Sequence, residues 1–312
     1  ARWNEELGRR EHWDETVDRY VNFIAEHCAE KYTALTKKEL EEIRSAILNL
    51  EVMPSMRALM TAGKAAKRDE AALYNCSYLP VNHIRSFDET LFLLSCGCGV
   101  GFSVENENVQ QLPLVPEELH PTDTTIIVSD SKIGWASALR ELISLLYAGK
   151  LPKWDTSRVR PAGSRLKVFG GFASGPLPLI DLFEFTVNLF KKAVGRKLFS
   201  LECHDLICKI ADTIIVGGTR RSALISLSDL SDDKMRTAKS GAWWETNTQR
   251  ALANNSAIYT EKPDISVFMK EWISLYESKS GERGLFNRKH STNQAKLTGR
   301  REYEGISFGS NP

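Results

Sequence analysis

The cysteines are the residues of this chain whose type and spacing could support redox or metal chemistry. Six cysteines in 312 residues are too few for a disulfide-stabilised secreted scaffold. Neither close pair has the two-residue spacing of zinc ligands, and no histidine pair completes a tetrahedral set. We therefore expect no metal site, and thiols that are reduced, buried or catalytic. The six are Cys28, Cys76, Cys96, Cys98, Cys203 and Cys208.

A glycine-rich segment begins at Cys96 and continues through Gly97, Gly99 and Gly101. Glycine permits positive φ angles and lets the backbone approach a ligand closely. The segment lacks the Lys-Ser/Thr pair of a P-loop, and it follows a predicted helix instead of opening one. It is therefore only weak evidence for phosphate binding.

Two adjacent arginines, Arg220 and Arg221, follow a Gly-Gly pair. A guanidinium group matches the geometry of a phosphate. The same side chains could equally form structural ion pairs around the glycine turn, and the sequence leaves both interpretations open.

Apolar periodicity predicts the helices that would position these groups. Thr36 and Glu39 form a capping box, and Ser86 and Glu89 form a second one before the next helix. Asp130 or Ser131 is expected to cap a later helix. The predicted helices cover residues 14–32, 36–50, 86–94, 131–149, 180–194, 201–216 and 266–277.

Shorter apolar runs predict strands, whereas a segment rich in proline and glutamate, residues 106–125, is predicted to be a loop. Alternation of helix and strand favours an α/β domain with a mainly parallel sheet. The predicted strands cover residues 73–81, 126–128, 222–227 and 256–260.

The composition suits a packed protein, since 42% of the residues are hydrophobic. A formal net charge of +1 gives no reason to invoke nucleic acid or a membrane as a partner. We find no signal peptide and no apolar run that suits a membrane span, so a cytoplasmic location is expected. The opening residues, Ala1-Arg2-Trp3-Asn4, do not look like an initiator sequence, so a truncated N-terminus is expected.

A series of short strings in a fixed order resembles one family, the adenosylcobalamin-dependent (class II) ribonucleotide reductases. Asn75-Cys76-Ser77-Tyr78 and the run that opens Phe169-Gly170-Gly171-Phe172 are the most distinctive. Each string alone is weak evidence for the family, but together the strings span essentially the whole chain and keep the family's order. The others lie at residues 1–3, 8–16, 54–59, 99–103, 130–135, 217–223, 253–256, 281–284 and 309–312.

The resemblance implies a fold and an activity. The fold would be the N-terminal portion of the ten-stranded α/β barrel of ribonucleotide reductases, preceded by a small helical region. Residues 1–53 would form that helical region, and residues 54–312 would form the first, incomplete part of the catalytic barrel. The activity would be radical-based reduction of ribonucleotides to deoxyribonucleotides for DNA synthesis, with adenosylcobalamin as the cofactor. We expect triphosphate substrates by this resemblance. The sequence itself does not decide between triphosphates and diphosphates.

The resemblance also assigns roles to individual residues. Cys76 would be one of the two reducing thiols, although alone it reads as a small buried residue in a strand. Asn311 would hydrogen-bond the ribose hydroxyls, and Ser55, Asn75 and Gly99 would help to hold the substrate. Taken alone, Asn311 and Ser55 would be ordinary turn residues and Gly99 a tight turn.

The segment 249–255 resembles the loop that couples effector identity to base choice. Within it, the resemblance points to Arg250, Asn254 and Asn255 as specificity residues. Such coupling requires a segment with two arrangements, biased by a second nucleotide. The monomeric subclass carries a longer insertion before Trp135 that builds its effector site, and this chain departs from it, because residues 130–135 follow the predicted strand directly. The effector site is therefore expected to lie at a dimer interface or to be reduced.

In this family the string that ends in Asn311-Pro312 is followed by Cys-Gly-Glu, which supplies the radical cysteine and a general base. We therefore expect this chain to need the C-terminal remainder of a reductase, joined through an intein or encoded by a split gene. The expected partners are a ribonucleotide substrate, a nucleotide effector and a dithiol reductant such as thioredoxin. The alternatives are a fragment of a class I-like large subunit, a non-catalytic nucleotide-binding fragment and an unrelated α/β structural protein.

Overall fold

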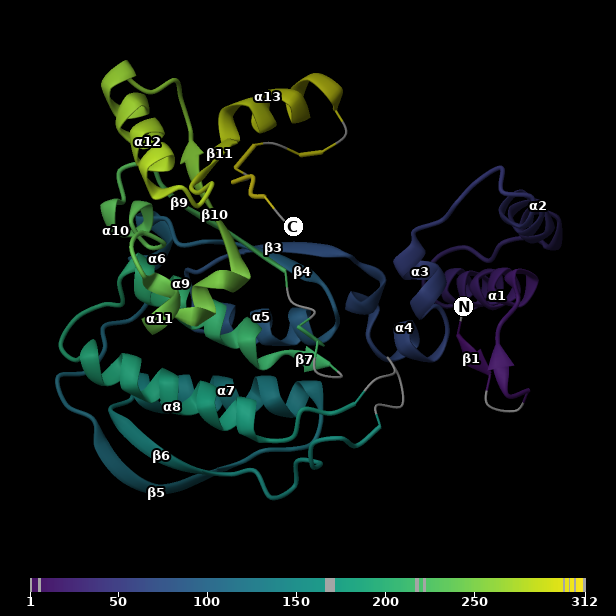
Figure 1. Ribbon diagram of the computed structural model, residues 1–312. Coiled ribbons are helices and arrows are strands. Elements are labelled where there is room, and N and C mark those ends of the chain that lie inside the picture. The colour runs from purple at the N-terminus through teal and green to yellow at the C-terminus, as the bar shows by residue number, and fades with distance from the viewer. Residues whose placement is uncertain are drawn as a thin grey trace. The chain divides into compact units, whose positions relative to one another are not determined.

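The computed structural model divides the chain into two compact units, residues 1–75 and 76–312 (Figure 1). The structure describes residues 2–4, 7–165, 172–216, 219–220, 223–299, 301–302, 304–305 and 307–310. Of residues 215–216 and 219–220 it describes the backbone alone. The boundary between the units lies later than the expected division after Met53. The reason is that Ala62 and Ala66 pack around Phe23 in the core of the first unit.

The first unit is a small helical unit with one short hairpin. Its two hydrophobic clusters centre on Val17, Val21 and Ile47 and on Phe23 and its neighbours. The Thr36 capping box is confirmed, because the Thr36 hydroxyl accepts a hydrogen bond from the Glu39 amide at 3.3 Å. Its elements are β1 (Trp3–Asn4), β2 (Arg9–Arg10), α1 (Trp13–Lys31), α2 (Lys37–Leu48), α3 (Met56–Thr61), α4 (Lys64–Arg68) and the 3-10 helix η1 (Glu70–Leu73).

The second unit is built around a five-stranded sheet with the order β11-β10-β9-β4-β3, in which every neighbouring pair is parallel. The predicted mainly parallel α/β sheet is therefore confirmed. Its strands are β3 (Cys76–Pro80), β4 (Gly99–Ser103), β9 (Leu224–Asp229), β10 (Ala253–Tyr259) and β11 (Gly284–Asn287). Two further pairs stand apart, β5 (His120–Ile127) with β6 (Lys150–Asp155) and β7 (Ile215–Val216) with β8 (Thr219–Arg220).

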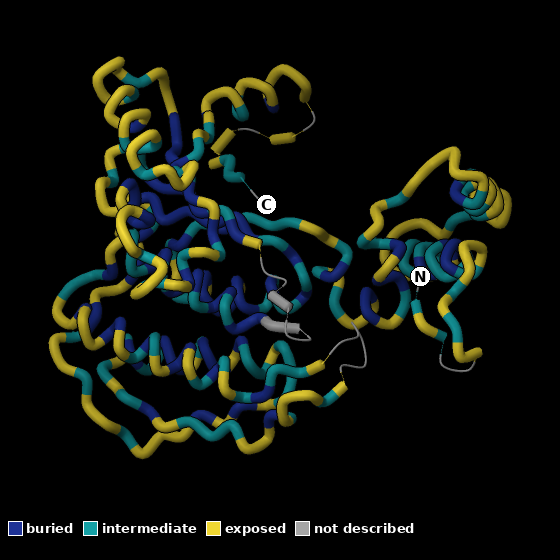
Figure 2. Tube along the Cα trace, in the orientation of Figure 1, coloured by how far each residue is buried: buried dark blue, intermediate teal, exposed yellow. Residues whose placement is uncertain are grey.

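Helices α5 and α9 cover one face of this sheet, and α7 and α8 form the next layer, outside which lie β5 and β6 (Figure 1). The large core lies between these layers, where Figure 2 shows buried chain along α5 and α9. The main helices are α5 (Arg85–Ser95), α7 (Lys132–Tyr147), α8 (Leu177–Lys192), α9 (Ser200–Thr213), α12 (Ile265–Ser278) and α13 (Arg288–Thr298). Short turns are α6 (Asn106–Val109), α10 (Asp233–Arg236), α11 (Trp243–Thr246) and η2 (Thr248–Leu252).

Two local predictions were wrong. Ser86 does not cap a helix, because α5 already begins at Arg85 and the Ser86 hydroxyl donates to the Pro80 carbonyl at 2.9 Å. The segment predicted to be a loop contains α6 and most of β5, because β5 pairs with the distant strand β6.

The Ser131 cap is confirmed, since its hydroxyl accepts from the Gly134 amide at 2.9 Å. Among the described residues, no helix has the length and apolarity that crossing a membrane requires.

A buried ionic network joins α12 to the end of β9. Glu271 accepts hydrogen bonds from Arg236 and Arg283, each at 2.7 Å, and its side chain is 4% exposed. Both arginines also donate to the Leu230 carbonyl. Burial alone would raise the pKa of Glu271, but the hydrogen bonds from the two arginines outweigh it and lower the pKa.

We predict that Glu271→Gln destabilises the chain by about 3 kcal/mol at pH 7, because two buried guanidinium groups lose their counter-charge. The lowered pKa means that the carboxylate contributes stability above its unfolded-state pKa and loses it as pH falls through the folded-state pKa. Urea denaturation at pH 7 and at pH 4 measures both effects. The exposed Glu277→Gln on the same helix is the control, and equal midpoints for the two variants would contradict the prediction.

Candidate functional site

Cys76 opens β3, and its register brings it directly beside Gly99 of β4. Side chains alternate along a strand, so Cys76 and Tyr78 share one face of the sheet with the β4 residues paired to them. We call this the Cys76 face, and it comprises Cys76, Tyr78, Gly99, Gly101 and Ser103. The other face carries Val100 and Phe102, which are buried in the large core. Two of the predicted site residues, Cys76 and Gly99, therefore lie together.

The glycine at position 99 lies in a regular strand, and the tight turn is at Gly97, whose φ is +83°. Gly99 adds no side chain to β4 beside the Cys76 thiol. Cys76 itself is half-buried.

The other predicted substrate residues belong to the first unit or lie outside the described residues. Ser55 stands at the N-cap of α3 and makes no side-chain capping bond. Asn75 accepts a hydrogen bond from Arg57 Nε at 3.1 Å and immediately precedes Cys76. Asn311 and Arg221 lie outside the described residues, as does the side chain of Arg220.

The predicted specificity residues do not form a loop. Arg250 lies in η2, where it forms a two-pronged ion pair with Asp205 at 2.7 and 2.6 Å and donates to the Ala238 carbonyl. Asn254 and Asn255 lie in β10 and point to opposite faces of the sheet. Asn255 is buried, and its Oδ1 lies 2.9 Å from Nε2 of the buried His204. Asn254 is exposed, whereas the Arg250 side chain is 11% exposed and held in its ion pair. Asn254 and Asn255 lie in regular structure because strand pairing of β10 with β9 begins at Ala253.

The two adjacent asparagines give a matched test of this arrangement. We predict that Asn255→Ala lowers the free energy of unfolding by about 1–3 kcal/mol, because it leaves the buried His204 nitrogen without its partner. Asn254→Ala is expected to change stability by less than about 0.5 kcal/mol. Denaturant titration of both variants decides the matter, and a reversed order of stability would contradict the assignment of faces.

The remaining cysteines of the second unit behave as core residues. Cys96, Cys98, Cys203 and Cys208 are all buried. Burial, followed by the charge of Glu202, raises the pKa of Cys203 far above its usual range, so its thiol stays protonated near neutral pH. Among the residues that the structure describes, no group of three or more His, Cys, Asp or Glu could hold a metal ion.

Alkylation of the native chain should therefore distinguish the half-buried Cys76 from the buried cysteines by their reaction rates. We predict that iodoacetamide modifies Cys76 at least about tenfold faster than Cys203, because a buried neutral thiol is inert. Peptide mass spectrometry of a time course measures the two rates, and denatured chain provides the reference in which all thiols react. Equal rates in the native chain would show that Cys203 is accessible and the assignment incorrect.

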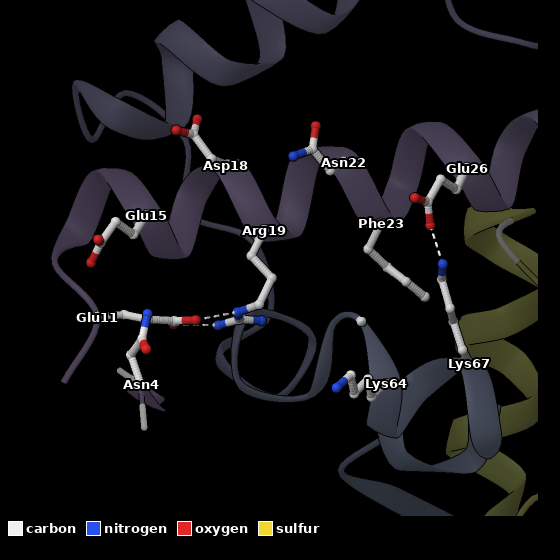
Figure 3. Close-up of a pocket in the computed structure, with 11 residues that line it drawn as sticks. Asn4, Glu11, Glu15, Asp18, Arg19, Asn22, Phe23, Glu26, Lys64 and Lys67 are labelled. Carbon is white, nitrogen blue, oxygen red and sulfur yellow. Dashed lines mark hydrogen bonds and ion pairs between the residues drawn. The ribbon is translucent and has the colours of Figure 1, made fainter. Parts of the chain in front are cut away.

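The first unit also has a groove of about 570 Å³, shown in Figure 3. Its charged side chains largely neutralise one another. Arg19 lies 2.8 Å from Glu11, and Lys67 pairs with Glu26. Arg19 also donates to the carbonyls of Leu59 and Ala62, so this cluster ties α1 to the C-terminal end of α3.

Sequence reasoning missed a cluster around Arg288, the first residue of α13. Arg288 pairs with Glu105 and donates to the Phe308 carbonyl. The three residues are far apart in the sequence and belong to no recognised motif, so only the fold reveals them. The cluster lies next to the Cys76 face, because Ser103 donates to Glu105 at 2.7 Å.

Comparison with known proteins gives three concordant matches. Residues 108–190 match the family model described as the B12-dependent ribonucleotide reductase insertion domain. The adenosylcobalamin-dependent ribonucleoside-triphosphate reductase of Lacticaseibacillus paracasei is 28% identical over 388 residues, covering 100% of this chain and 50% of that protein. A putative reductase of the same name from Mycobacterium phage D29 is 28% identical and covers 77% of this chain.

The fold also matches a solved structure, that of a B12-dependent (class II) ribonucleotide reductase. The TM-score is 0.77 at 24% identity, over 92% of this chain and 48% of that one. The chain thus spans about half the length of the relatives that it matches. The family resemblance and the barrel fold read from the sequence are both confirmed.

The match at residues 108–190 bears on the expected departure before Trp135. The stretch that is similar to the insertion-domain model covers β5, α7, β6 and most of α8. The alignment with the Lacticaseibacillus protein extends over 388 residues, more than the 312 of this chain, so the relative is the longer of the two in the aligned region.

Proposed function

We propose that this chain, which is similar in sequence and fold to the class II ribonucleotide reductases, forms the first part of such an enzyme. In this proposal it contributes to radical-based reduction of ribonucleoside triphosphates to deoxyribonucleotides. The observation that carries the proposal is the similarity to triphosphate reductases across the full length of the chain. The position of the half-buried Cys76 beside Gly99 in the sheet supports it.

The reaction replaces the ribose 2′-hydroxyl by hydrogen. The C2′–O bond breaks and the oxygen leaves as water, while two thiols lose their hydrogens and become a disulfide. Cys76 would be one of these thiols. A dithiol suits the step because it delivers two electrons and can be reset afterwards by thiol–disulfide exchange. Asn75 and Gly99, which flank Cys76 in sequence and in the sheet, would help to hold the nucleotide, as would Ser55 and Asn311.

The cofactor of the proposed enzyme is adenosylcobalamin, which relatives carry in their names. When bound, it supplies the radical by cleavage of its cobalt–carbon bond. Among the described residues, the half-buried Cys76 lies beside Gly99, which adds no side chain to that part of the sheet, and these two residues would line the approach to the thiol.

The partners follow from the same proposal. They are a ribonucleotide substrate, a nucleotide effector, the remainder of the reductase and a dithiol reductant such as thioredoxin, all in the cytoplasm. Asn254 is the residue of the predicted specificity set that could contact a nucleotide, because Arg250 and Asn255 are engaged within the second unit.

The test is an anaerobic assay with adenosylcobalamin, a dithiol and ribonucleoside triphosphates. We expect deoxyribonucleotide formation only when the chain is mixed with a C-terminal segment that begins Cys-Gly-Glu, because that segment would supply the radical cysteine. Cys76→Ser should abolish activity, whereas Cys28→Ser in α1 of the first unit should retain it. Robust product formation by this chain alone, or by the Cys76→Ser mixture, would contradict the proposal.

A further inference from the structure

Residues 307–310 lie against β3 on the Cys76 face. A Cβ atom added to Gly309 would overlap the ring of Tyr78, so the backbone of this segment rests on that ring. Tyr78 stands two residues along β3 from Cys76 and points to the same side of the sheet. Only glycine fits at this contact without a shift of the ring or of the segment.

Arg288 holds the same segment by its backbone. Its Nε donates to the Phe308 carbonyl at 2.7 Å, one residue before the contact of Gly309 with Tyr78. The two terminal nitrogens donate to the two carboxylate oxygens of Glu105 at 2.8 and 2.7 Å. A planar guanidinium that is bound on both edges has a fixed orientation, which a lysine cannot reproduce.

Glu105 is itself fixed to the end of β4. Ser103, the last residue of that strand, donates to the carboxylate at 2.7 Å and accepts from the Asn108 side chain at 3.0 Å. The side chains of Glu105 and Arg288 are only 4% and 11% exposed. Burial would lower the pKa of Arg288, but hydrogen bonding to Glu105 more than offsets this and raises it, so the guanidinium stays charged.

Such a pair is not explained by stability, because apolar residues of similar volume often stabilise a core as well as a buried ion pair does. What the pair adds is geometry. It connects the end of β4 to the carbonyl of Phe308, and so fixes residues 308–310 with respect to the strands that carry Cys76 and Gly99.

We propose that Arg288 is a positioning residue, which together with Glu105 and the Tyr78 ring sets the place of residues 308–310 beside the Cys76 face. This inference rests on the proposed function, in which Asn311 follows directly and contacts the ribose. Hydrogen transfer between thiol and sugar requires reacting atoms about 3–3.5 Å apart, and a displacement of ~1 Å can cost about 10²-fold in rate. A fixed anchor immediately before Asn311 meets that requirement.

The first test is hydrogen–deuterium exchange of the whole chain. Arg288→Met should speed exchange in peptides covering residues 301–310 on the order of tenfold, because bonds to a charged group are lost. Exchange in peptides covering β3 and β4 should rise by a smaller factor, because the buried Glu105 loses its partner, and the larger rise at 301–310 separates local release from unfolding. The exposed neighbour Lys289→Met is the matched control, and unchanged exchange at 301–310 in Arg288→Met would overturn the proposal.

A second variant leaves the ion pair intact. Gly309→Ala should release the same segment, because its new methyl group would collide with the Tyr78 ring. Removing the ring in the double variant Gly309→Ala/Tyr78→Ala should restore part of the protection relative to Gly309→Ala alone. Wild-type exchange in Gly309→Ala would show that the segment does not rest on Tyr78 and would also overturn the proposal.

The third measurement is kinetic and uses the chain mixed with the Cys-Gly-Glu segment. Arg288→Met should lower kcat about 10²-fold and leave KM within about twofold, because positioning is lost while substrate binding is kept. Arg288→Lys should recover only part of kcat. A changed KM with unchanged kcat would contradict a positioning role. If the wild-type mixture shows no reduction, the proposed function fails, and the exchange experiments still decide whether Arg288 anchors the segment.

Discussion

The parallel pairing of β3 with β4 is the constraint on which the site depends. It sets Cys76 beside Gly99 and Tyr78 beside Gly101, and it sends Val100 and Phe102 to the opposite face. A slip of one residue would bury the thiol under α5 and α9 and expose two core side chains. The packing of that core therefore fixes which side of the sheet the thiol occupies.

Buried ion pairs connect the helices to one another and to the ends of the strands. Glu271 binds α12 to the end of β9, Asp205 binds η2 to α9, and Glu105 binds α13 to the end of β4. In each case an arginine on one segment bonds a carboxylate on another and so fixes the position of the two segments. The hydrophobic layers define the fold, and these pairs define the relative positions of the segments at the ends of the strands.

The fold class, most helices and the likeness to the family could be predicted from the sequence, because helix periodicity, the Thr36 and Ser131 caps and the ordered strings are local signals. The Ser86 cap failed because its hydroxyl binds a carbonyl of the preceding strand, a tertiary contact that no local pattern reveals. Asn254 and Asn255 have almost the same sequence context, and only the register of β10 shows that one is exposed and the other bonds His204. The Arg288 cluster joins residues up to 183 positions apart, so it has no sequence signature.

In the proposed reaction, Cys76 donates reducing equivalents to a ribonucleotide. The most direct measurement is a single-turnover reaction without added dithiol, using the chain mixed with the Cys-Gly-Glu segment and adenosylcobalamin, followed by alkylation and mass spectrometry. We expect one Cys76-containing disulfide for each deoxyribonucleotide formed, since each turnover consumes two thiols. Deoxyribonucleotide formation with Cys76 still fully open to alkylation would contradict it.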